Sequence, residues 1–374
     1  MRKNILILGH NDATQFIDIY NQYTRLFDKD QYEVTVAYLT GEPNEATRQR
    51  TIAENVLFLN TSKNDIRTLK IPAIRRLLSL SRQKNFEIVI CHRYKPSYIM
   101  LWVAQFHSIP AVVCVMHELG TMASLGRQLL IAALGRKNIL FAGVSNAVRD
   151  DMRKNLWGIP KARVTTLYNM IDVELTEPQL LSRDDARRAL HLSPNDIVFG
   201  NVARLAPNKD QESLIKAFSQ IKPYCPKAKL LIIGEGELKS HLQAQVHSYG
   251  LNNDVIFTGF LPCGFRYMKA FDCFVLSSVQ EAFGRVLLEA MVAKLPIIAT
   301  RVHGIPEVMG ETGLLIQPRD HSAMASAMKK IYTLSDEERG QVGEKAYQHM
   351  IAHFSIPAFK KQFWQLPLMQ SLKE

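Results

Sequence analysis

Two glutamates, Glu281 and Glu289, stand eight residues apart, and their carboxylates can accept hydrogen bonds from the hydroxyl groups of a ligand. Glu289 lies within residues 286–295, a nearly continuous apolar run that predicts a helix buried on most sides. A carboxylate in such a helix costs free energy unless it is paired or hydrogen-bonded. Glu289 is therefore either a core residue in a salt bridge or a carboxylate that meets a polyhydroxyl ligand.

The residues between these glutamates indicate a phosphate site. Phe283 and Gly284 come just before the predicted helix, where free backbone N–H groups and the helix dipole favour anions. Arg285 follows, and its side chain either reaches a diphosphate or a charged acceptor, or faces solvent. One short segment thus offers carboxylates for sugar hydroxyls and amides for phosphate.

Two cations, Arg204 and Lys209, follow an apolar strand and are suited to bind phosphate. Arginine chelates phosphate with two hydrogen bonds, and lysine adds a mobile point charge. Such cations are common at strand ends, so they indicate a phosphate site only in combination with the glutamate segment. Gly234 ends another apolar run and permits close approach of backbone to a ligand. It does not belong to a dinucleotide-binding fingerprint, because Lys239 stands where the third glycine would fall.

His117 follows the apolar run 111–115 and is a candidate contact for a ligand. The carboxyl end of a parallel strand is where such sheets bind ligands, although a histidine after a strand is often structural. The D-x-D sequence at 28–30 lies in a polar turn between a helix and a strand. We therefore predict no metal site.

Two successive α/β units must position these residues. Short apolar runs alternate with helical patterns throughout, which predicts parallel sheets covered on both faces. Expected strands of the first unit are 4–8, 33–38, 56–59, 88–91, 111–115, 139–143 and 164–167. Those of the second are 197–202, 230–233, 255–257, 273–276, 296–299 and 314–316. We expect two Rossmann-like, doubly wound domains, 1–175 and 176–354, that face across a cleft. We also expect a hinge over 172–194, and residues 355–374 packing back on the first domain.

Length and composition set the protein class. A chain of 374 residues with 47% hydrophobic and 22% charged residues is typical of two globular domains. Five cysteines without C-x-x-C spacing indicate reduced thiols in a cytoplasmic protein. The apolar run 5–8 near the N-terminus is too short for a secretory or spanning segment. We expect a protein that is soluble or peripheral on the inner face of the cytoplasmic membrane.

A net charge of +11 favours acidic partners, and much of it lies in residues 63–95. That stretch has nine cations and two acids, with a predicted helix over 72–84. The helix either docks on the sheet with a solvated basic face or binds an anionic membrane surface. Nucleic acid is excluded as a partner, because the stretch lacks interleaved aromatic residues and any recognised module.

Taken together and in this order, the motifs resemble the retaining, family 4-like glycosyltransferases of the GT-B fold that carry an E-x7-E motif. Glu281 and Glu289 match that motif in spacing and context. Further matching segments are 200–209, 169–172, 255–259, 304–307 and 313–318, with His117 and 144–146 in the first half.

The resemblance implies roles for the two domains and for these residues. Residues 1–175 would form the acceptor-side domain, and residues 176–354 would bind the nucleotide-sugar. Glu289 would bind the ribose of a nucleotide-diphospho-sugar, a UDP-sugar, and Glu281 with the amides of Phe283 and Gly284 would bind its sugar. Arg204 and Lys209 would neutralise the diphosphate. The implied catalytic residues are His117, Glu281, Arg204 and Lys209, and the donor-binding set adds Gly9, Gly234, Phe283, Gly284, Arg285 and Glu289.

The resemblance also implies the reaction. A hexose-type sugar would pass with retention, and with no metal or other cofactor, to a lipid-linked or glycan acceptor, such as lipopolysaccharide core or O-antigen. The departing phosphate would help to take the acceptor's proton in a front-face attack.

Two loops depart from the family pattern. Gly9 is followed by His10 where the family has a second glycine, and His303 replaces the first glycine of the loop around Gly304. The first departure leaves room for a catalytically silent sugar-nucleotide-binding protein as an alternative. A GT-B epimerase is a further alternative, whereas a phosphorylase would need a pyridoxal lysine site that is not identifiable.

Overall fold

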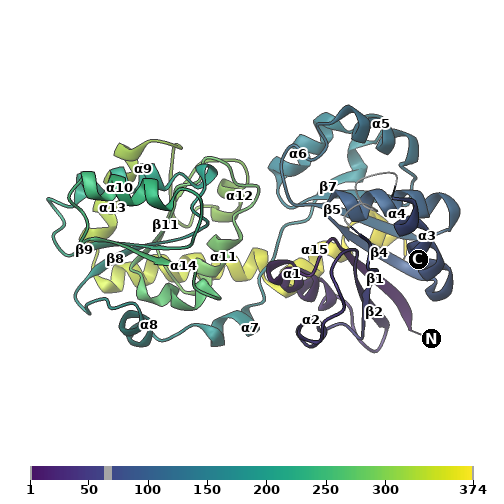
Figure 1. Cartoon of the computed structure of the whole chain (residues 1–374), viewed down its shortest axis with the longest axis horizontal. Helices are drawn as coiled ribbons and strands as arrows, with labels where there is room; N and C mark the ends of the chain where they lie inside the picture. The colour runs from purple at the N-terminus through teal and green to yellow at the C-terminus, as the bar shows by residue number, and fades with distance from the viewer. Residues whose placement is uncertain (1, 63–69, 373–374) are drawn as a thin grey trace. The chain divides into compact units, whose positions relative to one another are not determined.

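The computed structural model describes residues 2–62 and 70–372 and divides the chain into two compact units (Figure 1). Unit 1 comprises Met1–Asn169 and Ile356–Glu374, and unit 2 comprises Met170–Ser355. The division falls just after Asn169, a few residues before the expected boundary at 175.

Unit 1 is built on a parallel sheet in the order β3-β2-β1-β4-β5-β6-β7. Its strands lie close to the predicted ranges: β1 Lys3–Gly9, β2 Tyr32–Tyr38, β3 Asn55–Phe58, β4 Phe86–His92, β5 Ala111–Met116, β6 Ile139–Gly143 and β7 Val164–Thr166. The helices are α1 Thr14–Thr24, α2 Glu45–Arg50, α3 Ile71–Lys84, α4 Tyr94–Phe106, α5 Leu125–Leu134, α6 Asn146–Asn155, α15 Ile356–Trp364 and α16 Pro367–Gln370. The strand order reverses between β1 and β4, so ligands are expected at the carboxyl ends of these two strands.

Unit 2 repeats this plan with a parallel sheet in the order β10-β9-β8-β11-β12-β13. Its strands are β8 Ile197–Val202, β9 Ala228–Ile233, β10 Val255–Gly259, β11 Cys273–Leu276, β12 Ile297–Thr300 and β13 Leu314–Ile316. Its helices are α7 Val173–Thr176, α8 Arg183–Ala189, α9 Gln211–Ile221, α10 Lys239–Ser248, α11 Arg285–Val292, α12 Ile305–Met309, α13 His321–Thr333 and α14 Asp336–Phe354. Here the order reverses between β8 and β11, which carry the predicted phosphate loop and the glutamate segment.

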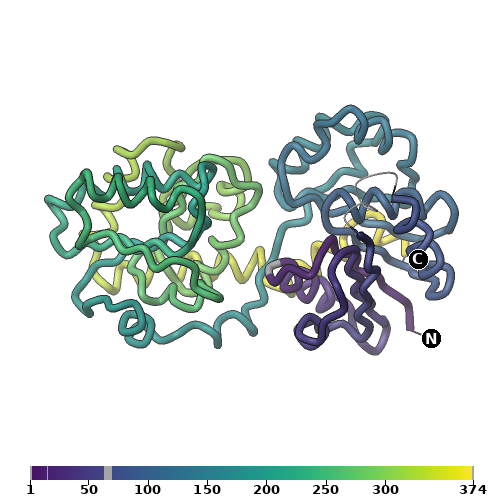
Figure 2. Tube along the Cα trace, viewed as in Figure 1, coloured from purple at the N-terminus to yellow at the C-terminus, as the bar shows by residue number. Residues whose placement is uncertain are grey.

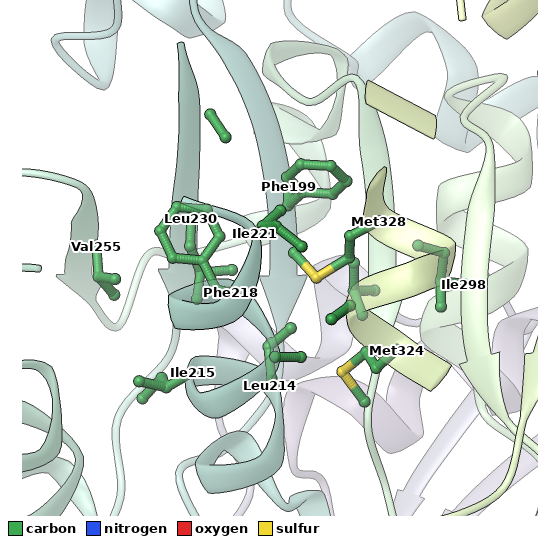
Figure 3. Packing of buried hydrophobic residues seen from close by; sticks show 14 of the residues in the cluster. Phe199, Leu214, Ile215, Phe218, Ile221, Leu230, Val255, Ile298, Met324 and Met328 are labelled. Atoms are coloured by element: carbon green, nitrogen blue, oxygen red, sulfur yellow. The ribbon is translucent and has the colours of Figure 1, made fainter. Parts of the chain in front are cut away.

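The core of unit 2 holds its sheet against α9 and α13 (Figure 3). Phe199 and Leu230 project from β8 and β9 and are fully buried. Phe218 of α9 and Met328 of α13 pack into the same cluster. Because apolar side chains cover β8 and β9, the loops at their carboxyl ends start from a rigid base.

The last residues of the chain return to unit 1, where α15 packs on α1 (Figure 2). Phe359 stands edge-on to Tyr23 with ring centroids 5.1 Å apart, and Phe363 stands edge-on to Phe27 at 5.8 Å. Phe359 and Phe363 are both fully buried. Aromatic burial therefore anchors this segment on the first sheet.

The segment 172–194 is not the hinge that its polar composition predicted. It forms α7 and α8, and Arg187 of α8 is buried in an ion pair of 2.8 Å with Asp272, just before β11. Asp272 also accepts a hydrogen bond from the Val198 amide of β8. A charged side chain thus fixes the segment to the sheet, a role that composition alone does not reveal.

Among the cysteines, Cys91, Cys114, Cys225 and Cys273 are buried thiols as expected, whereas Cys263 is exposed. No helix in the described part of the chain is long and apolar enough to cross a membrane.

Candidate active site

The loops that follow β8 and β11 meet, and an ion pair between Lys209 Nζ and Glu281 Oε2 joins them. Lys209 ends a short 3-10 turn, Pro207–Lys209, and its carbonyl accepts a 2.7 Å hydrogen bond from Ser277 Oγ. The Val279 amide donates a 3.0 Å bond to the Asn208 carbonyl. The structure thus brings together a cation and a carboxylate that are 72 residues apart in sequence.

Glu281 is also held by a neighbouring backbone. Its carbonyl accepts a 3.2 Å bond from the Gly304 amide. A side chain at Gly304 would overlap the Ala282 carbonyl, so glycine is required where these two loops cross. His303, which precedes it, adopts a φ of 41°. The departure from the family pattern at His303 therefore leaves the contact with Glu281 in place.

Helix α11 begins beside Glu281. Gly284 caps it with a φ of 88°, a conformation that favours glycine. The Phe283 ring is buried and stands edge-on to Phe354 at 5.7 Å, so its side chain is core and only its backbone is available to a ligand. Glu289 is half-buried, because it lies off the helix face that buries Leu287, Leu288, Ala290, Met291 and Val292. Arg285 is likewise half-exposed.

Arg204 is exposed on a loop that is fixed on both sides. The amides of Ala203 and Leu205 donate to the carbonyls of Ile233 and Glu235 at 3.1 and 3.0 Å. A side chain at Gly234 would overlap the Ala203 carbonyl. Gly234 is therefore needed for the packing of two protein loops, a different reason from the predicted approach of a ligand.

In unit 1, His117 lies at the carboxyl end of β5 and contacts a second histidine. Its Nε2 is 3.1 Å from Nδ1 of His92, which is fully buried at the end of β4. Burial, reinforced by the neighbouring His117, lowers the pKa of His92 well below its usual range. A neutral His92 therefore orients the ring of His117.

His117 lines a cavity of about 580 Å³ that lies within unit 1. We call it the basic cavity, and its lining includes His10, Lys70, Arg93, Lys95, His117 and Arg127. Burial, with the charges of Lys95 and Arg93, lowers the pKa of His10 to about 4. His10 is the residue that replaces the second glycine after β1, while Gly9 itself is required because a side chain there would overlap the Tyr20 ring.

Two family models match the chain, one on each unit. The model described as "Glycosyl transferases group 1" matches residues 182–349, and "Glycosyltransferase Family 4" matches residues 22–175. The chain belongs to the GT-B glycosyltransferases that these two models describe.

Two curated relatives of this glycosyltransferase are named for sugar transfer to a diphospho-undecaprenol-linked sugar and for lipopolysaccharide core biosynthesis. It is 28% identical, over 78% of its length and 79% of the relative's, to the N-acetylgalactosamine-N,N'-diacetylbacillosaminyl-diphospho-undecaprenol 4-alpha-N-acetylgalactosaminyltransferase of Campylobacter jejuni. It is 27% identical, over 44% of its length and 48% of the relative's, to the lipopolysaccharide core biosynthesis glycosyltransferase LpsE of Rhizobium meliloti.

Solved structures share its fold. Anabaena HepE, crystallised with UDP, aligns over the whole of both chains with a TM-score of 0.78 and 20% identity. The two Rossmann-like units of the glycosyltransferase are those of the GT-B fold.

The candidate site includes residues that the sequence did not point to. Ser277 and Gln211 each bond a loop carbonyl, that of Lys209 and that of Arg204, the latter at 3.1 Å. Small polar residues after strands are too common to be noticed without the contact. Arg127 of the basic cavity was missed because it stands alone in an apolar helix.

Where the structure describes them, at residues 70–95, the cations of the stretch 63–95 do not form one surface. Residues 63–69 lie outside the described residues, and Lys70, Arg93 and Lys95 line the basic cavity. Exposed arginines on the solvent face of α3 account for three more: Arg75, Arg76 and Arg82. Helix α3 docks through its buried residues Ala73, Leu77 and Ser81.

Proposed function

We propose that this glycosyltransferase moves a hexose-type sugar, with retention, from a UDP-sugar to a lipid-linked glycan such as lipopolysaccharide core or O-antigen. The observation that carries the donor assignment is the Lys209–Glu281 ion pair beside the N-terminus of α11. It combines a cation for phosphate, a carboxylate for hydroxyls and backbone amides in one place.

Each donor-site residue has a task in this proposal. Arg204 and Lys209 neutralise the diphosphate, and Glu289 accepts hydrogen bonds from the ribose hydroxyls. Glu281 and the amides of Phe283 and Gly284 hold the sugar. Lys209 keeps its bond to Glu281 and adds one to the phosphate, so that sugar and leaving group are fixed by the same pair.

The reaction follows from where charge develops. The bond between the anomeric carbon and the phosphate oxygen breaks, and the carbon gains positive character as the diphosphate gains negative charge. Fixed cations stabilise that leaving group. Because folding has already positioned them, they need not reorganise during the reaction. The acceptor oxygen then bonds to the same face of the sugar, and its proton passes to the departing phosphate. We assign the supporting contact on this face of the sugar to His117, with His92 orienting its ring.

The proposed acceptor takes its support from the relatives. The Campylobacter enzyme is named for a diphospho-undecaprenol acceptor, and the Rhizobium enzyme for lipopolysaccharide core biosynthesis. With such an acceptor, we propose that the enzyme works at the inner face of the cytoplasmic membrane. The exposed arginines of α3 are suited to anionic lipid there.

Membrane attachment is tested by flotation with anionic liposomes at low salt. Arg76 already donates to the Asn60 carbonyl at 2.9 Å, so Arg75→Glu with Arg82→Glu is the sharper variant. It should abolish flotation, while Lys137→Glu with Lys154→Glu, exposed cations elsewhere in unit 1, should retain it. No flotation of the parent, or equal flotation of both variants, would exclude this attachment.

The donor is tested by a thermal-shift panel of UDP-, GDP- and other nucleotide sugars, since a ligand of the folded state raises the melting temperature. A UDP-sugar should give the largest rise. The product made from it on a prenyl-diphospho-sugar or a lipopolysaccharide core should keep the donor's anomeric configuration, as read by NMR. Inversion would remove the retaining mechanism, and nucleotide binding without turnover on any acceptor would favour the catalytically silent alternative.

A further inference from the structure

The basic cavity of unit 1 gathers four cations from three separate segments. Lys70 precedes α3, Arg93 and Lys95 lie at the start of α4, and Arg127 belongs to α5. One carboxylate, Glu118, is among the lining residues, and it pairs with Arg93 at 2.8 Å. Cations therefore exceed acids by three at the cavity.

These cations are held close together in spite of their mutual repulsion. Lys70 is buried, with its ammonium 4.1 Å from the centre of the Tyr98 ring. Arg127 lies over the Tyr94 ring at 4.3 Å. Burial, with the charges of Lys95 and Arg127, lowers the pKa of Lys70. Lys70 is buried and the other three cations are half-buried. Positive charges gathered around one cavity attract anions, which points to an anionic ligand.

The backbone at two of the cations is also unfavourable. Arg93 has a φ of 75° and a ψ of 171°, a region that almost only glycine adopts. Its amide donates to the Val115 carbonyl at 2.9 Å and its carbonyl accepts from Ser97 Oγ at 2.8 Å, so β5 and α4 hold it there. Lys70 has a φ of 60°. Such conformations are concentrated at binding sites, where the surrounding structure enforces them.

We propose that the basic cavity binds the phosphoryl group of the acceptor, a phosphate or diphosphate ester. This inference rests on the proposed function, because it names the acceptor chemistry of the same transferase. An excess of three cations matches a diphosphate better than a single carboxylate, and arginine forks fit phosphate oxygens. A cavity of about 580 Å³ also has room for an attached sugar.

Helix α5 suggests how a lipid-linked ester would differ from a soluble sugar phosphate. Leu125 and Leu129 stand one turn apart on this helix and are 62% and 59% exposed, next to the position of Arg127. An apolar chain attached to the phosphate has an apolar surface within reach of the cavity. The phosphoryl chemistry is shared by both sources, and the experiment separates them.

The test measures binding of inorganic pyrophosphate by isothermal titration calorimetry, with UDP at saturation so that the unit 2 site is occupied. The variant is Lys95→Gln with Arg127→Gln, and the matched control is Lys137→Gln with Lys154→Gln, two exposed cations of unit 1 outside the cavity. We expect the affinity to fall at least tenfold in the variant and less than twofold in the control. Absence of binding to the parent, or equal affinity in parent and variant, would overturn the proposal.

Two further titrations identify the source of the phosphoryl group. Farnesyl diphosphate should bind more tightly than glucose 1-phosphate if the acceptor is lipid-linked, and Leu125→Ser with Leu129→Ser should weaken only the former. The reverse preference assigns a soluble sugar phosphate, and both results support a phosphoryl site. If neither ester loses affinity in the Lys95→Gln, Arg127→Gln variant, the proposal is wrong.

The UDP titration that precedes these experiments separates this inference from the proposed function. Absence of UDP binding to the parent would contradict the proposed donor without affecting the pyrophosphate result. UDP binding and sugar transfer without pyrophosphate binding would remove the phosphoryl site alone.

Discussion

The two units share a sheet plan, yet the sites at their switch points differ in construction. Unit 2 uses tight backbone crossings, with Gly234 and Gly304 against neighbouring carbonyls, to fix a single ion pair. Unit 1 presents an open cavity lined by long cationic side chains and histidines. A rigid backbone suits a ligand of constant structure, whereas long side chains suit a ligand whose structure varies. The comparison therefore favours donor recognition in unit 2 and acceptor recognition in unit 1.

The largest effect should come from the ion pair of unit 2. Lys209→Gln removes a cation from the leaving group and leaves Glu281 without it, so sugar transfer should fall about 100-fold or more, as for other fixed electrostatic contacts. Arg204→Ala and Glu289→Ala should also lose most activity. The assay is release of UDP from the donor in the presence of acceptor.

Lys216→Gln, which changes an exposed cation on α9 of the same unit, serves as the control and should transfer sugar at the parent rate. Far-UV circular dichroism and the thermal midpoint should be unchanged in all of these variants. Parent-like turnover by Lys209→Gln would remove the assigned role of that residue.

The next largest effect is on protein stability, and it tests whether the stability of unit 2 depends on its tight backbone crossings. Gly234→Ala would push a methyl group into the Ala203 carbonyl and should lower the free energy of unfolding by about 1–3 kcal/mol. Gly340→Ala is the matched control, because a methyl group there meets nothing within 4 Å and the residue lies inside α14.

That control should raise stability by about 0.5–1 kcal/mol, since alanine favours helix more than glycine does. Urea titrations followed by circular dichroism measure both changes. Equal stability of the two variants would show that the crossing of the loops at Gly234 is not tight.

The smallest effect is the loss of stability of unit 1 at acidic pH. The pKa of His10 is about 4 in the folded chain and near 6.5 in the unfolded chain, so the unfolded chain binds the extra proton between these values. The free energy of unfolding should thus fall as the pH falls from 6.5 towards 4, by about 1 kcal/mol because His10 is partly exposed.

Tryptophan fluorescence isolates this effect, because Trp102, Trp157 and Trp364, the three tryptophans of the chain, all belong to unit 1. His92, whose pKa is also lowered, adds to the loss of stability of the parent at acidic pH. His10→Gln should make the pH dependence shallower in urea titrations at pH 7 and 5. An unchanged slope would mean that His10 is not neutral in the folded chain.

Strands and the donor loops were predictable because their signals are local. Apolar runs mark the strands, and β6, β8, β11 and β13 match the predicted ranges end to end. Glu281 and Gly284 lie in one short segment, so their neighbourhood follows from sequence spacing. The exposure of Glu289 was not predictable, because the apolar run does not say which helix face the core covers.

The basic cavity was not predictable for a physical reason. Lys70, Arg93 and Arg127 come together only because the order of the strands brings the N-terminal ends of α3, α4 and α5 to one cavity. In the sequence, two of them merge into a charge-rich stretch that resembles a membrane-binding surface, and the third is isolated. Charge counts along a chain do not tell which cations share a cavity.

The central claim, that the Lys209–Glu281 pair of unit 2 holds the donor nucleotide, is tested most directly by titrating UDP into three proteins. These are the parent, Lys209→Gln, and Lys95→Gln with Arg127→Gln. We predict that UDP affinity falls at least tenfold in Lys209→Gln, about 1.4 kcal/mol, and less than twofold in the cavity variant. Unchanged affinity in Lys209→Gln, or a larger loss in the cavity variant, would contradict the account.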